Sequence, residues 1–166
     1  GGLKGGLQEE EPLDIRQRRF ELRELIMMQK ITASWDCTEV IRRAMSVFGG
    51  HGVMEEFSVL PRLYRDAAVN ELWEGPRNVL ITQMHRDFQR ASKWYEPKSF
   101  VANVLAGADS QVIAALGEQM ETLLRHPGLF TMDAATIDVC RRWDRFCDDF
   151  YHAYQDLALQ EVLDGV

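Results

Sequence analysis

The chain has 166 residues, 46% of them hydrophobic, and a net charge of −7. This length and apolar content predict one folded domain with a sizeable core and argue against disorder. No apolar run approaches the roughly 20 residues of a membrane helix, so no membrane association is expected. The negative charge lies in residues 96–166, because residues 1–95 hold equal numbers of basic and acidic side chains. That segment is therefore not expected to bind nucleic acid.

The beginning of the chain, residues 1–13, is rich in Gly and Glu and has no hydrophobic period, which predicts a flexible lead or linker. It contains neither an initiating Met nor the apolar segment of a signal peptide, so we expect a piece of a longer protein. Cys37, Cys140 and Cys147 form no Cys-x-x-Cys pair, which is typical of reduced thiols in a cytoplasmic protein.

A long helix is predicted over residues 14–48. Asp14 and Gln17 have the spacing of a capping box, and Gly49 and Gly50 supply the left-handed residue that ends a helix. Apolar residues recur every three or four positions, which predicts one buried stripe. The stripe comprises Phe20, Leu22, Leu25, Ile26, Ile31, Trp35, Val40, Ile41, Ala44, Val47 and Phe48. Such a helix is about 50 Å long and needs partners along most of its length.

Five further helices are predicted, with Gly or Pro near most breaks. They cover residues 63–73, 76–95, 99–105, 110–125 and 132–163. In the last of them, for which Thr131 is the expected N-cap, the stripe is that of a bundle seam. Its members are Cys140, Trp143, Cys147, Phe150, Tyr154 and Leu157.

No strand-like alternation occurs, so the predicted fold is all-α. We expect an up-and-down bundle of long antiparallel helices. Residues 14–95 form its first helical region, and residues 96–166 form an acidic helical extension that packs on the same bundle.

Two turns contain residues that could take part in binding or catalysis. The glycines at Gly49, Gly50 and Gly52 would let a phosphate or ribose approach the backbone, but taken alone they fit a helix C-cap with a flexible turn better. His51 between them has no second ligand at helical spacing, so no metal site is predicted.

The second turn centres on Glu74, between Trp73 and Gly75 and just before Pro76. A carboxylate shielded by an aromatic neighbour becomes a better general base, and the free N–H groups of a turn can polarise a carbonyl oxygen. Together they would remove a proton α to a carbonyl. The alternative is an exposed Glu at a helix junction, where it favours the dipole of the following helix.

Three segments occur in a telling order: Phe-Gly-Gly-His-Gly-Val at 48–53, Leu-Tyr-Arg-Asp-Ala at 63–67 and Leu-Trp-Glu-Gly-Pro-Arg-Asn at 72–78. This order and spacing resemble the C-terminal helical domain of the acyl-CoA dehydrogenase flavoprotein family over about residues 31–88. The acidic segment beyond about Tyr95, together with Trp before the Glu, resembles the alkylation-damage-response branch of that family.

The resemblance implies a role for Glu74 as the base that removes the α-proton of an acyl-CoA while the β-hydride goes to FAD. It places Trp73, Gly75 and Arg86 near the substrate and Asn78 near the flavin.

The resemblance also implies that Gly49 and Gly50 meet the ADP part of a neighbouring subunit's FAD, in a homodimer or homotetramer that passes electrons to an acceptor. Two residues depart from the family pattern, which has Gln where Ser46 stands and Thr or Ser where Pro76 stands. Both predict altered contacts with FAD.

The family's N-terminal helical and central β-domains are not found in these residues, so the isolated piece is not expected to be active. Two other functions remain open. One is a binding or protective protein that keeps the flavoprotein scaffold without efficient turnover, and the other is a helical oligomerisation module.

Overall fold

The computed structural model describes residues 11–165, and these contain α-helices and one short 3-10 helix but no strand, which confirms the predicted all-α fold. The predicted lead falls almost wholly outside the described residues. None of the described helices is both long and apolar enough to cross a membrane. The elements are α1 (Leu13–Val47), η1 (Gly49–Val53), α2 (Leu60–Leu72), α3 (Arg77–Ala91), α4 (Pro97–Val104), α5 (Ser110–Leu124) and α6 (Ala134–Asp164).

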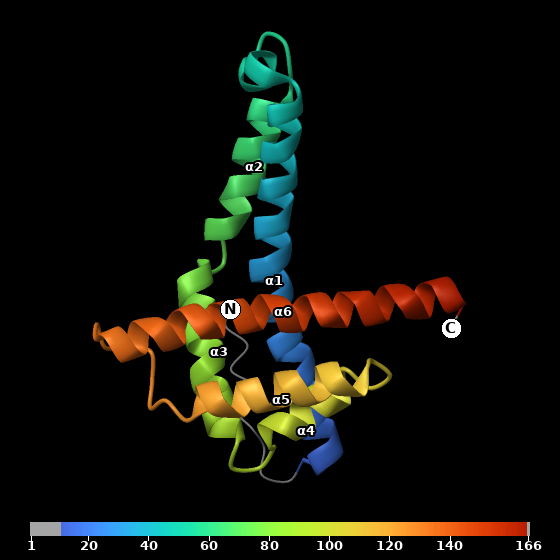
Figure 1. The fold of residues 1–166 in the computed structure, drawn as a ribbon, viewed down its shortest axis with the longest axis vertical. Coiled ribbons are helices and arrows are strands. Elements are labelled where there is room, and N and C mark those ends of the chain that lie inside the picture. The colour runs from blue at the N-terminus through green and yellow to red at the C-terminus, as the bar shows by residue number, and fades with distance from the viewer. Residues whose placement is uncertain (1–10, 166) are drawn as a thin grey trace.

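Helices α1 and α2 form a long antiparallel hairpin that extends away from the rest of the molecule (Figure 1). Gly49, with φ of +57°, follows the C-cap residue Phe48, so the predicted glycine end of the helix is confirmed. Gly52 is required for a different reason. A Cβ there would lie 2.2 Å from the main-chain oxygen of Met45, so the tip of the hairpin can close only on a glycine.

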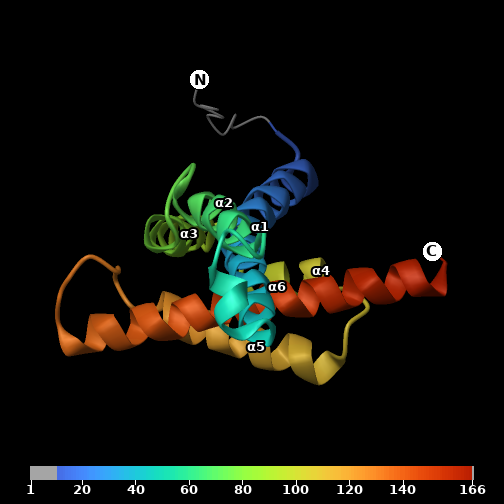
Figure 2. The same ribbon diagram turned by 90° about the horizontal axis from the view of Figure 1, so that it is seen from above.

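Helix α3 continues downward from the end of α2, and α5 and α6 lie across α1 and α3 (Figures 1 and 2). The core lies where these helices meet and is built on aromatic rings. Trp143 and Phe146 are stacked, with ring centroids 5.2 Å apart, and Phe88 meets Phe100 edge to face at 4.7 Å. The predicted seam of α6 supplies Trp143, Cys147 and Phe150 to this core. All three cysteines are free, as predicted.

Two predicted helix caps are wrong. Helix α1 begins after Pro12 and has no side-chain cap, so Asp14 lies inside the first turn instead of preceding it. The proline ring fixes φ at Pro12, so the chain can enter the helix there without a side-chain acceptor for the first N–H groups. At α6 the N-cap is Asp133, whose carboxylate accepts from Thr136 N at 2.9 Å, while the Thr131 hydroxyl donates to Asp133 at 2.6 Å. The expected cap therefore supports the real one.

The predicted apolar stripe of α1 is also largely wrong. Several of its members are exposed in the described part of the chain: Leu22, Ile26, Trp35, Val40, Val47 and Phe48. The buried face instead contains Glu24, Met28, Ile31, Thr32 and Thr38. Only part of α1 crosses the core, and its distal part contacts mainly α2 and η1, so no single stripe is buried along the whole helix.

Candidate functional site

The turn at residues 73–76 connects α2 to α3, as the sequence predicted. The N–H of Trp73 donates to Val69 O at 3.0 Å and closes α2, and Pro76 precedes the first residue of α3. Between them, Glu74 has φ of +56° and Gly75 has φ of +110°. Within residues 11–165, Glu74 is the one non-glycine residue with positive φ. Because this conformation costs a non-glycine residue roughly 1–2 kcal/mol, neighbouring contacts must hold it.

Lys30 on α1 provides one of these contacts. Its ammonium group donates to Gly75 O at 2.7 Å and lies 3.4 Å from Glu71 O, so it bridges the end of α2 and the turn. On the other side, a Cβ added at Gly75 would lie 3.2 Å from the Leu80 side chain. Sequence reasoning missed Lys30, since nothing in the spacing of α1 connects it with a turn 45 residues later.

Arg77, the first residue of α3, lies directly after the turn and joins it to α6. Its Nε donates to Asp144 Oδ1 at 2.7 Å, and its Nη2 donates to Asp148. Its Nη1 also donates to Ile31 O at 3.3 Å. Burial lowers the pKa of Arg77, but Asp148 and Asp144 together hold it above its usual value. The guanidinium group is therefore a permanent charge beside the turn.

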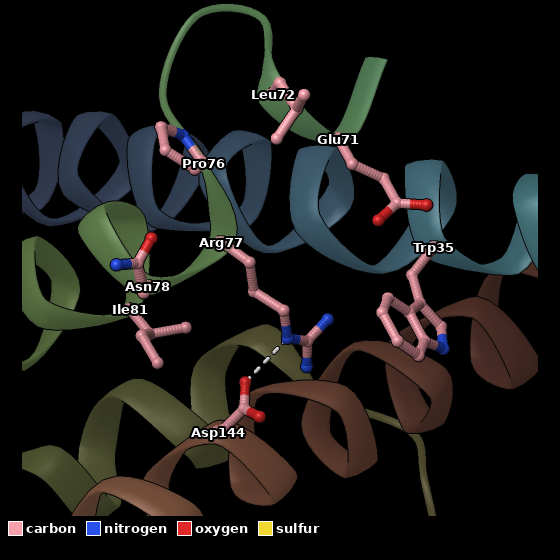
Figure 3. A pocket seen from close by; sticks show the side chains of 8 residues that line it. All are labelled: Trp35, Glu71, Leu72, Pro76, Arg77, Asn78, Ile81 and Asp144. Carbon is pink, nitrogen blue, oxygen red and sulfur yellow. Dashed lines mark hydrogen bonds and ion pairs between the residues drawn. The ribbon is translucent and has the colours of Figure 1, made fainter. Parts of the chain in front are cut away.

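A pocket of about 300 Å³ opens beside the turn (Figure 3). Residues from four helices and the turn line it: Trp35, Glu71, Leu72, Pro76, Arg77, Asn78, Ile81 and Asp144. Glu74 itself does not line the pocket, but Leu72 and Pro76, two positions before and after it in the sequence, do. The wall therefore combines an aromatic ring, apolar side chains and the Arg77–Asp144 ion pair.

The predicted residues of this turn are open to solvent in the described part of the chain. Glu74 and Asn78 are exposed, and Trp73 is 67% exposed, so the prediction that Trp73 shields Glu74 from water is wrong here. The main-chain N–H groups of Glu74 and Gly75 donate to no main-chain oxygen among residues 11–165, as the break between helices predicted. The turn thus places a carboxylate beside main-chain N–H groups.

The structure does not gather all the predicted residues at one place. Gly75 and Asn78 lie within four positions of Glu74, but Arg86 is exposed more than two turns further along α3. Gly49 and Gly50 lie at the other end of the hairpin. Lys30 contacts Gly75 O, and α1 rises about 25 Å from Lys30 to Val47, so the glycines lie roughly that far from Glu74.

A second pocket, of about 350 Å³, lies at the tip of the hairpin. Its lining includes Gly49, Ser46 and Arg42, together with Met45, Val53 and Tyr64. A Cβ at Gly49 or Gly50 would meet no atom within 4 Å, so the backbone there is open to an approaching group. The hydroxyl of Ser46 donates to Arg42 O at 3.2 Å, within its own helix.

Two buried polar residues near the core were not predicted. Glu24 is fully buried, and neither carboxylate oxygen has a hydrogen-bond partner among the described residues. Burial raises the pKa of Glu24 well above its usual value, Arg23 opposes this shift, and Asp87 adds to it. His85 is held by Leu123 O at 3.2 Å from Nε2, and burial lowers the pKa of its ring. In residues 11–165 no three His, Cys, Asp or Glu side chains form a metal site.

Comparison with known proteins gives one family match and two similar proteins. Residues 10–88 match the family described as "Acyl-CoA dehydrogenase, C-terminal domain". The chain is 34% identical over 87 residues to "Putative acyl-CoA dehydrogenase AidB" of Escherichia coli (strain K12), which covers 52% of this chain and 16% of that protein. It is 37% identical over 67 residues to "Acyl-CoA dehydrogenase family member 11" of Caenorhabditis elegans, covering 40% of this chain and 11% of that protein.

The matched segments thus span less than a fifth of either relative's length. No solved structure gave a significant match. The family match includes the hairpin, the turn around Glu74 and most of α3, and it ends before α4. Residues 10–88, just under half of the chain, are therefore similar to the C-terminal domain of the acyl-CoA dehydrogenase family.

Proposed function

We propose that this chain is the C-terminal portion of an FAD-dependent acyl-CoA dehydrogenase in which Glu74 removes the α-proton of the thioester. The observation that carries the proposal is the conformation of Glu74. It is the one non-glycine residue in the described segment with positive φ, and it lies in the family-matched part of the chain. Strained non-glycine residues cluster at functional sites, where the surrounding structure holds them.

The chemistry fits the groups at this turn. The Glu74 carboxylate would take the α-proton, and the main-chain N–H of Glu74 would donate to the thioester oxygen as negative charge develops on it. When bound, FAD would accept the β-hydride, so the two electrons of the broken C–H bond leave with it. Exposure of Glu74 in this segment suits a base whose substrate is enclosed by other parts of a longer protein.

The residues implied for FAD fit that cofactor in part. Gly49 and Gly50 leave open backbone beside the pocket at the hairpin tip, and Asn78 lines the pocket near Glu74. Because these two places lie about 25 Å apart, we assign them to two FAD molecules in an oligomer, as the resemblance implies. We therefore include a homodimer or homotetramer and an electron acceptor in the proposal.

The test uses the full-length protein that contains these residues. Purified protein should be yellow and should reduce an artificial electron acceptor with at least one of butyryl-, octanoyl- and palmitoyl-CoA. Glu74→Gln should lower kcat by about 10²–10⁴-fold, the usual contribution of a general base, while FAD remains bound. Glu56→Gln, an exposed change in the loop after η1, is the matched control and should retain turnover. Full turnover by Glu74→Gln would refute the assignment.

One observation favours a second candidate, a flavoprotein scaffold without efficient turnover. Ser46 donates to its own helix, and Pro76 has no N–H to offer to a cofactor. Neither residue can make the contacts of the amide and hydroxyl that the family pattern has there. A yellow full-length protein that reduces no acceptor with any of the three thioesters would favour this candidate.

A further inference from the structure

The segment beyond the family match reaches the candidate site. The match ends at residue 88, whereas α6 spans Ala134–Asp164. Yet Asp144 of α6 forms part of the pocket wall beside the turn and faces Arg77 in Figure 3. The family-matched segment therefore does not complete this region by itself.

Arg77 is the point at which three helices meet. Its guanidinium group binds Asp144 and Asp148 of α6 and donates to Ile31 O of α1. Asp148 is fixed in turn, because it accepts from the hydroxyl of Thr32 on α1 at 2.8 Å. The Arg77 side chain is only 22% exposed, so these charge-assisted hydrogen bonds are partly shielded from solvent.

The backbone of the turn is consequently held at both ends. Lys30 binds Gly75 O from α1, and Arg77 fixes the chain two residues later against α1 and α6. Lys30 also lies 3.4 Å from Glu71 O, before the turn, so Glu74 keeps its unfavourable positive φ between contacts at Glu71 and at Arg77. A strained residue persists only when its surroundings over-determine it, and Arg77 connects the turn to a helix outside the family match.

We propose that Arg77, held by Asp144 and Asp148 of α6, is a positioning residue that keeps the turn at residues 73–76, and Glu74 with it, in its reactive conformation. This inference rests on the proposed function for its catalytic consequence. The acidic extension then has a defined role, since its carboxylates orient the base through Arg77. Partly buried ion pairs add little net stability but fix geometry well, which suits this role.

The test compares Arg77→Met, Arg77→Lys and Asp148→Asn in the FAD-loaded full-length protein. The matched control is Arg141→Met, which breaks an exposed pair with Asp138 on the same helix. Hydrogen exchange at the hydrogen-bonded amides that flank the turn should accelerate by about tenfold in Arg77→Met and Asp148→Asn, the scale of one lost charge-assisted hydrogen bond. These amides are the N–H of Trp73, which donates to Val69 O at 3.0 Å, and the N–H of Leu80, which donates to Pro76 O at 3.2 Å. Exchange in the core of α6 should stay as in the control.

For the catalytic arm, kcat with an acyl-CoA should fall by about tenfold in Arg77→Met while KM changes much less, because the loss affects the base and not binding. Arg77→Lys, which can reach one carboxylate, should recover part of kcat. The double variant Arg77→Met with Asp148→Asn should be no worse than Arg77→Met, since the two side chains act as a unit. If Arg77→Met does not fold, Asp144→Asn gives the same comparison with one ion pair retained.

Unchanged exchange at the Trp73 and Leu80 amides, or acceleration spread equally over all helices, would overturn the inference and leave Arg77 with a role only in the stability of the fold. An unaltered kcat in Arg77→Met would overturn it as well. A wild-type protein with no turnover would instead defeat the proposed function, and the exchange measurement would still decide whether Arg77 holds the turn.

Discussion

The two ends of this molecule differ in how they use apolar side chains. Where α3, α5 and α6 meet α1, aromatic rings are buried against one another, and Trp143, Phe146 and Phe150 are completely enclosed. The distal hairpin instead leaves a large set of apolar residues exposed on the described chain. They are Val47, Phe48, Val53, Met54, Phe57, Val59, Leu63, Val69, Leu72 and Trp73.

This contrast separates a self-sufficient core from a surface suited to contacts with other protein. Exposed apolar side chains mark contacts with other protein where they adjoin in a patch. The hairpin also connects the two predicted site regions, Gly49 at its tip and Glu74 at its base. Its exposed residues therefore fit the oligomeric flavoenzyme proposed above.

The largest expected effect comes from the core. Trp143 is fully buried, and its Nε1 donates to Ile81 O at 2.8 Å. Trp143→Ala should lower the free energy of unfolding by about 3–5 kcal/mol in urea denaturation of this chain. Phe48→Ala at the exposed hairpin should change it by less than about 0.5 kcal/mol. Equal losses of unfolding free energy in the two variants would contradict the distinction between the two regions. A larger loss for Phe48→Ala in the full-length protein than in this chain would show that the hairpin surface is covered there.

Glu24 should give the next largest effect, with the opposite sign. Glu24→Met removes a buried carboxylate with no hydrogen-bond partner among the described residues, so it should raise the free energy of unfolding by about 1–3 kcal/mol at pH 7. A destabilising Glu24→Met would contradict the description of this site.

The pH dependence provides an independent check on Glu24. Because its pKa is raised in the fold, its contribution to stability is complete below the unfolded value of 4.5 and is lost as pH rises through the folded pKa. Glu24→Met should therefore flatten the loss of stability above pH 4.5. Glu39→Gln is the control, because the pKa of Glu39 is lowered to about 2 by Arg42 and Arg43 and its contribution changes only below 4.5.

The smallest expected effect tests a helix cap. Asp109 caps α5 by accepting from Gln111 N at 2.7 Å, whereas Asp14 makes no cap at α1. Asp109→Ala should cost about 1 kcal/mol of unfolding free energy, and Asp14→Ala should cost much less. Urea denaturation of the two variants measures these losses of unfolding free energy. A larger loss for Asp14→Ala than for Asp109→Ala would support the capping box predicted at Asp14.

The sequence predicted the helices well but their environment only in part. Gly49, Gly75 and Pro76 interrupt helices through their own backbone preferences. The ends of α1 and α2 and the break at Glu74 could therefore be found without a structure. The seam of α6 was predictable because that helix crosses the core with one face. The stripe of α1 was not, because partners change along its length, and the division into residues 14–95 and 96–166 stays a prediction.

The candidate site shows the same limit. Motif spacing identifies Glu74 and its neighbours, but Lys30 and Arg77 act on the turn through partners 45 to 71 positions away in the sequence. No periodicity encodes such pairs. The buried position of Glu24 is equally unexpected, since a charged residue in an amphipathic helix is normally assigned to its solvent face.

The most direct test of the central claim follows the α-proton itself. FAD-loaded full-length protein is incubated with octanoyl-CoA in deuterium oxide, with butyryl- and palmitoyl-CoA in parallel, and deuterium at the α-carbon is measured by mass spectrometry. The account predicts exchange by the wild-type protein and a loss of at least about 100-fold in Glu74→Gln. Exchange at the wild-type rate in Glu74→Gln would show that another group removes the proton and would contradict the account.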